Sequence, residues 1–178
     1  VASEEIVLRP VRKIVVYILP HSHTDIGYTD IQTAIETKQV DNLLGGIEYA
    51  RKTAGYPEGA RFIWNVEVLW AADLYLRRLS AAQKADFLDA VKKGQVSLNG
   101  MYLNELTGLC RPEELIRLFR FATVLAEKSG VPIDSCMISD VPGYVWSSVT
   151  AMAHAGVRYF STAPNYFDRI GTILREWE

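Results

Sequence analysis

The sequence predicts an α/β fold, in which strand–helix units repeat around a parallel sheet that is either open or closed as a barrel. Short apolar runs rich in β-branched and aromatic residues alternate with segments of helical periodicity along the 178 residues. Polar side chains follow the ends of these runs, which is where α/β folds bind their ligands. The chain has no internal repeat and no linker, so we expect one domain over residues 1–178.

The composition indicates a soluble globular chain, with 49% hydrophobic residues, 22% charged residues and a net charge of -2. Basic residues are scattered and no apolar run approaches the roughly 20 residues that span a bilayer, so we expect neither a nucleic acid nor a membrane as a partner. Cys110 and Cys136 have neither metal-site nor disulfide-scaffold spacing and are predicted to be free thiols. Two free thiols do not distinguish a cytoplasmic protein from a secreted or periplasmic one.

The first predicted strand covers residues 13–19 (KIVVYIL), an unbroken apolar run typical of a central strand buried on both faces. Pro20 suits its exit from the sheet. The helix that follows is expected to start at Thr29, because Thr29 and Gln32 match a capping box, and to run to about Thr53. Adjacent glycines at positions 45 and 46 provide a point where this helix kinks or divides.

The remaining units follow in order. Strands are predicted at residues 61–65, 95–99, 135–139 and 157–160. Helices are predicted at 66–79, at 80–94 with a capping box from Ser80 to Gln83, at 112–129, and after the turn 141–143 as far as Ala155. Gly130 and Gly156 are expected to end the last two helices.

The most informative polar stretch is residues 21–28 (HSHTDIGY), directly after the first predicted strand. Imidazole and carboxylate groups are good zinc donors, and alternate residues of an extended segment share a face. We therefore predict that His23 and Asp25 are metal ligands and that His21 orients them from outside the coordination shell. The alternative is that all three satisfy only loop backbone groups.

Further polar residues lie at the ends of the later strands: Glu67, Asn104, Glu105 and Asp140. Because the carboxyl ends of parallel strands lie at one edge of a sheet, these residues are predicted to form one site with residues 21–28, here called the His/Asp loop. Each has an ordinary structural explanation as well. Asp140 suits the N-cap of the next helix, and Glu67 suits a helix start. His154, at a helix C-terminus, is predicted to be structural.

The motifs at residues 21–28 and 140–143 (DVPG), in this order, resemble those of glycoside hydrolase family 38, the α-mannosidases and their relatives. The resemblance implies an irregular β/α barrel with one zinc ion, held here by His23, Asp25 and Asp140. It also implies a retaining α-glycosidase in which Asp140 is the nucleophile and Tyr28 lies beneath the bound sugar. Glu67, Asn104 and Glu105 fall in segments similar to the family's and are expected to contact the carbohydrate substrate.

The sequence departs from the family pattern in three respects. The proline of the second motif is displaced by one position, and the place of a basic residue near the sugar is taken by Pro164. The family's fourth zinc ligand and its general acid lie further downstream, so we expect these residues to be the amino-terminal portion of a longer catalytic domain. Two alternatives remain open: another metal-dependent hydrolase on a β/α barrel, either an amidohydrolase or a carbohydrate deacetylase, and a non-catalytic carbohydrate-binding relative.

Overall fold

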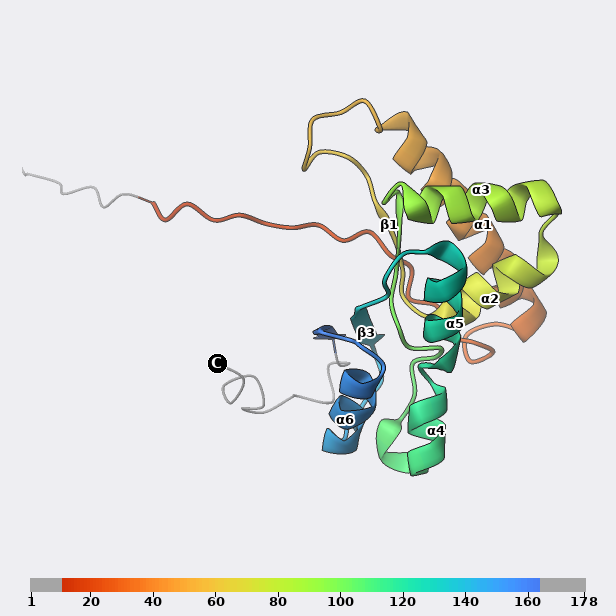
Figure 1. The fold of residues 1–178 in the computed structure, drawn as a ribbon, viewed down its shortest axis with the longest axis vertical. Coiled ribbons are helices and arrows are strands. Elements are labelled where there is room, and N and C mark those ends of the chain that lie inside the picture. Colours follow the sequence, from red (N-terminus) through yellow and green to blue (C-terminus); the bar gives the residue numbers. More distant parts are fainter. Residues whose placement is uncertain (1–10, 164–178) are drawn as a thin grey trace, which may run out of the picture.

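The computed structural model describes residues 11–163, in which helices and short strands alternate (Figure 1). The strands are β1 (Trp64–Val66), β2 (Val96–Leu98), β3 (Ser135–Ser139) and β4 (Tyr159–Ala163). The helices are α1 (Gln32–Lys52), α2 (Leu69–Arg78), α3 (Ala81–Lys92), α4 (Pro112–Arg117), α5 (Arg120–Ser129) and α6 (Trp146–His154), with a 3-10 turn, η1, at Thr107–Leu109.

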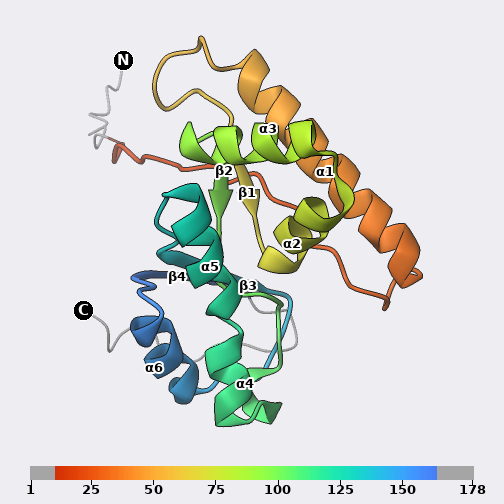
Figure 2. The same ribbon diagram turned by 45° about the vertical axis from the view of Figure 1, so that its right-hand side comes forward.

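All strand pairs in the described residues are parallel, as predicted. β1 pairs with β2 and β3 pairs with β4, and the two pairs lie next to each other in Figure 2. The Gly100 N–H, just after β2, donates to the carbonyl of Ser135 at the start of β3, at 2.7 Å. Within residues 11–163 the strands do not close into a barrel, so that part of the prediction is not seen.

The predicted strand at residues 13–19 is wrong for the described structure. This segment is extended but belongs to no sheet, and Figure 1 shows it leaving the body of the protein. The side chains from Ile14 to Leu19 are 55–84% exposed. Only its end pairs, through a parallel bridge between His21 and Asn65. The sequence preference is real, but a strand forms only where a partner and a covering layer bury it.

Two main apolar clusters hold the elements together, and a third, of Ile35, Trp70 and Leu74, joins α1 to α2. The larger one joins α1, α2, α3 and α5 to β1 and β2, and includes Leu69, Tyr75 and Phe87. The smaller one joins α4 and α6 to β3, and includes Leu115, Phe119, Cys136, Ile138 and Met152. Glu67 directly follows β1 and Asp140 directly follows β3, so the core that holds these two strands also positions both residues.

Several predicted boundaries are confirmed. β3 covers the predicted residues, the Ser80 capping box closes with both of its hydrogen bonds, and Gly130 ends α5 with φ 70°. Other boundaries are wrong. α1 starts after Ile31 without a side-chain cap and continues through Gly45 and Gly46.

The helix predicted at residues 112–129 breaks at positions 118–119 into α4 and α5. At this break the Leu118 carbonyl accepts a hydrogen bond from the Tyr102 N–H at 2.9 Å, a contact that sequence periodicity cannot foresee. None of the helices among residues 11–163 combines the length and apolar character needed to cross a bilayer. Pro164, one of the departures from the family pattern, lies outside the described residues.

Candidate metal centre

The His/Asp loop is fixed to the carboxyl end of β1 by Asn65. The Asn65 backbone N–H donates to the Pro20 carbonyl at 2.9 Å, and its side-chain amide donates to the same oxygen at 3.2 Å. Asn65 is 7% exposed, so water does not compete effectively for these bonds. The residues that follow, His21 to Asp25, are therefore directed across the end of the sheet.

Asp140 ends β3 in a left-handed conformation, with φ 60°, the one positive value at a non-glycine position in the described residues. Its N–H donates to the Ala163 carbonyl of β4 at 2.8 Å. A non-glycine residue pays a conformational penalty in this region, which is why such residues concentrate at functional sites. The conformation ends the strand abruptly and turns the carboxylate towards His23.

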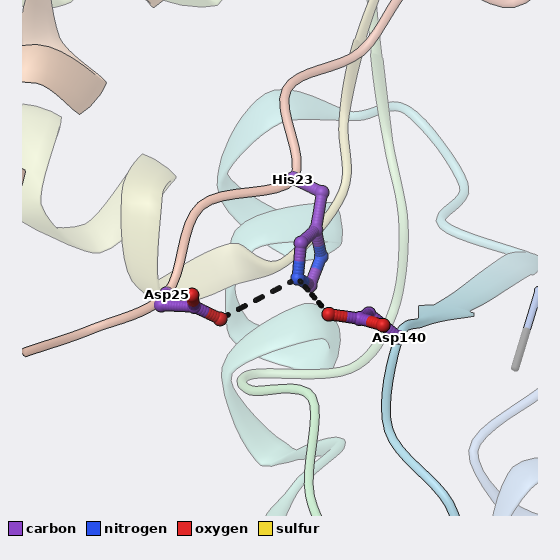
Figure 3. Close-up of side chains that lie close together, drawn as sticks. All are labelled: His23, Asp25 and Asp140. Atoms are coloured by element: carbon purple, nitrogen blue, oxygen red, sulfur yellow. Dashed lines mark ion pairs between the residues drawn. The ribbon is translucent and has the colours of Figure 1, made fainter. Parts of the chain in front are cut away.

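The three donor groups meet although they come from distant parts of the chain (Figure 3). Nε2 of His23 lies 3.7 Å from Oδ1 of Asp25 and 3.7 Å from Oδ2 of Asp140. One donor atom from each residue lies within 4.8 Å of the others. Two atoms bound to one tetrahedral zinc ion at about 2.1 Å lie roughly 3.4 Å apart, so the two 3.7 Å separations from Nε2 are close to those around such an ion.

Glu67 lies beneath the two histidines and is 4% exposed. Its Oε2 is 2.7 Å from Nδ1 of His21, and its Oε1 is 2.7 Å from Nδ1 of His23. The Asn104 amide also donates to Oε1, at 2.6 Å. The carboxylate of Glu67 therefore has three partners within the protein.

These contacts shift the pKa values of both partners. Burial raises the pKa of Glu67, but the hydrogen bonds from His23, Asn104 and His21 outweigh it, and the net pKa is lowered. The hydrogen bond to Glu67 raises the pKa of His23 more than burial lowers it, and the charges of Asp140 and Asp25 add to the rise. The site therefore combines a carboxylate, Glu67, whose ionised form is favoured, with the imidazole of His23, which also lies near Asp25 and Asp140.

The other residues considered from the sequence lie outside the cluster of His23, Asp25 and Asp140. His21 is not in the three-residue cluster but shares Glu67 with His23. Tyr28 is 91% exposed, Glu105 is half-buried beside Asn104, and His154 is exposed at the end of α6. The predicted contacts of Tyr28, Glu67, Asn104 and Glu105 with substrate stay predictions.

Sequence reasoning missed two residues that build the site. Asn65 anchors the His/Asp loop, and Thr107, 1% exposed, binds the turn that follows Asp140. Neither belongs to a local motif, because each acts on a segment more than thirty residues away. An asparagine in a short predicted strand, where it is unfavourable, was the one available indication.

Known proteins resemble this chain in sequence pattern and in fold. Residues 13–175 match the family model described as the glycosyl hydrolases family 38 N-terminal domain. An alpha-mannosidase from Enterococcus faecalis V583 is similar in structure, with a TM-score of 0.66 and 21% identity over 82% of this chain. A protein in glycosyl hydrolase family 38 from Enterococcus faecalis has a TM-score of 0.63 and 17% identity over 81% of this chain.

At these identities the likeness to the two structures concerns the fold. The chain spans 16% of the length of each of the two proteins. No curated protein sequence matches the chain.

Proposed function

This chain belongs to glycosyl hydrolase family 38, and we propose that it forms part of a zinc-dependent, retaining α-glycosidase that hydrolyses α-mannosides in oligosaccharides or glycans. The observation that carries the proposal is that His23 and Asp25, from the loop after Pro20, meet Asp140 at the carboxyl end of β3. The irregular β/α barrel and the remainder of a longer chain are part of the same proposal.

The three residues are proposed to hold one zinc ion, with Nε2 of His23 and a carboxylate oxygen from each aspartate as ligands. The donor set, one imidazole and two carboxylates, is of the kind that zinc accepts in catalytic sites, where positions also stay open for substrate. When bound, zinc would favour the ionised form of Asp140 and polarise adjacent hydroxyls of the sugar.

Asp140 is proposed to be the nucleophile. Its side chain is 56% exposed, so a substrate can reach it, and its backbone holds the carboxylate at the end of β3. The carboxylate attacks the anomeric carbon as the aglycone oxygen departs with a proton from a general acid. Water then attacks the same carbon from the face that the aglycone left and releases Asp140, so the sugar keeps its configuration.

Two further roles belong to the proposal. Tyr28 presents an almost fully exposed ring from the His/Asp loop, and such a ring suits the apolar face of a pyranose. The general acid and a further metal ligand, a histidine, are expected from a part of the longer chain beyond the described residues.

The test is turnover of an aryl α-mannoside by the intact protein carrying Asp140→Ala. Loss of a nucleophile should abolish turnover, whereas Asp41→Ala, which removes an exposed aspartate on α1, should leave it unchanged. Appreciable residual activity in Asp140→Ala would refute the nucleophile assignment. An inverted product anomer, observed by NMR during hydrolysis, would refute retention.

A further inference from the structure

We propose that Glu67 is a positioning residue which fixes the tautomer and ring orientation of His21 and His23 together, leaving Nε2 of His23 free to bind a metal. The proposal rests on the proposed function for the identity of the metal, but its tautomer assignment concerns this chain alone. It also gives Glu67 a role other than the substrate contact expected from the sequence.

The geometry requires both imidazoles to donate. An ionised carboxylate can only accept hydrogen bonds, and each Nδ1 lies 2.7 Å from a different oxygen of Glu67. Each Nδ1 must therefore carry a proton. In the neutral ring the other nitrogen, Nε2, then has its lone pair exposed. For His23 that lone pair faces Asp25 and Asp140.

Asn104 fixes the carboxylate in turn. Its Nδ2 lies 2.6 Å from Oε1 of Glu67, and an amide oxygen in that place would be repelled by the carboxylate. Within the described part of the chain, its buried Oδ1 has no hydrogen-bond partner, which agrees with an orientation set by Glu67 alone. The Glu67 carboxylate therefore accepts three hydrogen bonds, from His21, His23 and Asn104.

Burial argues against direct substrate contact for Glu67. The residue is 4% exposed, and both oxygens already have partners. A carboxylate placed this way restricts the rotation of two rings and raises the basicity of the ligating nitrogen. It acts on the metal through His23, so it is not itself a ligand.

Nitrogen-15 NMR of the imidazole rings tests the proposal directly, in metal-free chain with uniformly labelled histidine. The 178 residues contain three histidines, and the exposed His154 serves as an internal reference. We expect the protonated nitrogen to be Nδ1 in both His21 and His23 at a pH where the rings are neutral. Protonation at Nε2 in either ring would overturn the proposal.

The Glu67→Gln variant sharpens this test because an amide has one accepting and one donating end. The donor from Asn104 lies on the Oε1 side, so the new carbonyl oxygen is expected to face Asn104 and His23, and the new amide nitrogen to face His21. His21 should then change to the Nε2-protonated tautomer while His23 keeps its own. Unchanged spectra for both rings would contradict the role of Glu67.

Zinc affinity provides a second measurement, made on the intact protein by competition with a chelator. We expect Glu67→Ala to weaken zinc binding by roughly 10–100-fold, as with other residues that orient a metal ligand, and Glu67→Gln to weaken it less. Glu127→Gln, which changes an exposed acid on α5, is the matched control and should bind as the unchanged protein does. Where the control binds zinc, an equal affinity in Glu67→Ala would overturn the proposal.

The two measurements separate this inference from the proposed function. Nδ1-protonated rings in a protein that binds no zinc would refute the zinc site and leave the positioning role intact. Zinc binding by a protein whose rings are protonated at Nε2 would refute the positioning role alone.

Discussion

The side-chain hydroxyl of Thr107 donates a hydrogen bond to the Gly143 carbonyl at 3.3 Å, which joins η1 to the turn after Asp140. The same oxygen accepts a hydrogen bond from the Val145 N–H at 3.2 Å. The Gly108 N–H donates to the Gly143 carbonyl as well, at 3.0 Å. The turn that follows the proposed nucleophile is therefore held by a residue that never touches the metal cluster.

Thr107→Val should perturb this turn although it conserves the shape of the side chain. Removing the hydroxyl leaves the half-buried Val145 N–H without this partner, at a cost of about 1 kcal/mol in the free energy of unfolding. Thr107→Ser keeps the hydroxyl and loses one methyl group. We expect urea unfolding and turnover to show a larger loss for Val than for Ser, and the opposite order would contradict the role of the hydroxyl.

Gly46 lets α1 lie directly against β1. A Cβ atom added at Gly46 would approach Cγ of Trp64 to 2.5 Å, whereas one added at Gly45 would meet nothing within 4 Å. We expect Gly46→Ala to lower the free energy of unfolding by about 1–3 kcal/mol through overpacking. Gly45→Ala is the matched control and should raise it by up to about 1 kcal/mol, because glycine is unfavourable within a helix. Equal effects in denaturant unfolding would refute this packing.

The two cysteines should differ in reactivity. Cys136 is 1% exposed, and burial raises the pKa of its thiol to about 12. At pH 8 roughly one molecule in ten thousand then carries the thiolate that reacts. Burial and the nearby carboxylates of Glu105 and Glu114 also raise the pKa of the half-buried Cys110.

Alkylation by iodoacetamide under native conditions, followed by peptide mass analysis, should therefore modify Cys110 before Cys136. Cys136 should react only with denaturant present or at strongly alkaline pH, where the thiolate fraction rises. Labelling of Cys136 at the rate of an exposed thiol would show that β3 is not buried as described.

Tyr28 should affect substrate binding without affecting stability. Its ring is 91% exposed, so Tyr28→Ala should change the free energy of unfolding by no more than about 0.5 kcal/mol. If the ring contacts the sugar, KM for an aryl α-mannoside should rise in Tyr28→Ala and stay close to its original value in Tyr28→Phe. An unchanged KM in both variants would remove Tyr28 from the substrate site.

Local patterns predicted much of the fold. The alternation of strands and helices, the Ser80 capping box and the residues of β3 depend on near neighbours in sequence, and all are found. The parallel pairing joins strands that are far apart in sequence, but it follows from the alternation of strands and helices and is found as well. The failures involve distant partners. Residues 13–19 have the composition of a central strand but are exposed, and α4 and α5 separate where Leu118 meets Tyr102.

In the candidate site, too, the features that local motifs carry were predicted and those that depend on distant contacts were not. The donor types in His23, Asp25 and Asp140 could be read from two motifs, and the structure brings them together. The position of Glu67 beneath both histidines could not be read in this way, because it depends on how the loop after Pro20 crosses the end of β1. A buried acid at the start of a helix looks ordinary until its partners are known.

Zinc content is the most direct test of the central claim that His23, Asp25 and Asp140 hold one metal ion. The measurement is elemental analysis of the intact protein after exhaustive dialysis, with His23→Ala beside it. We predict about one zinc ion per chain in the unchanged protein and a substantial loss in His23→Ala, since removing one of few ligands weakens the site. Zinc retained in full by His23→Ala, or absent from the unchanged protein, would contradict the claim.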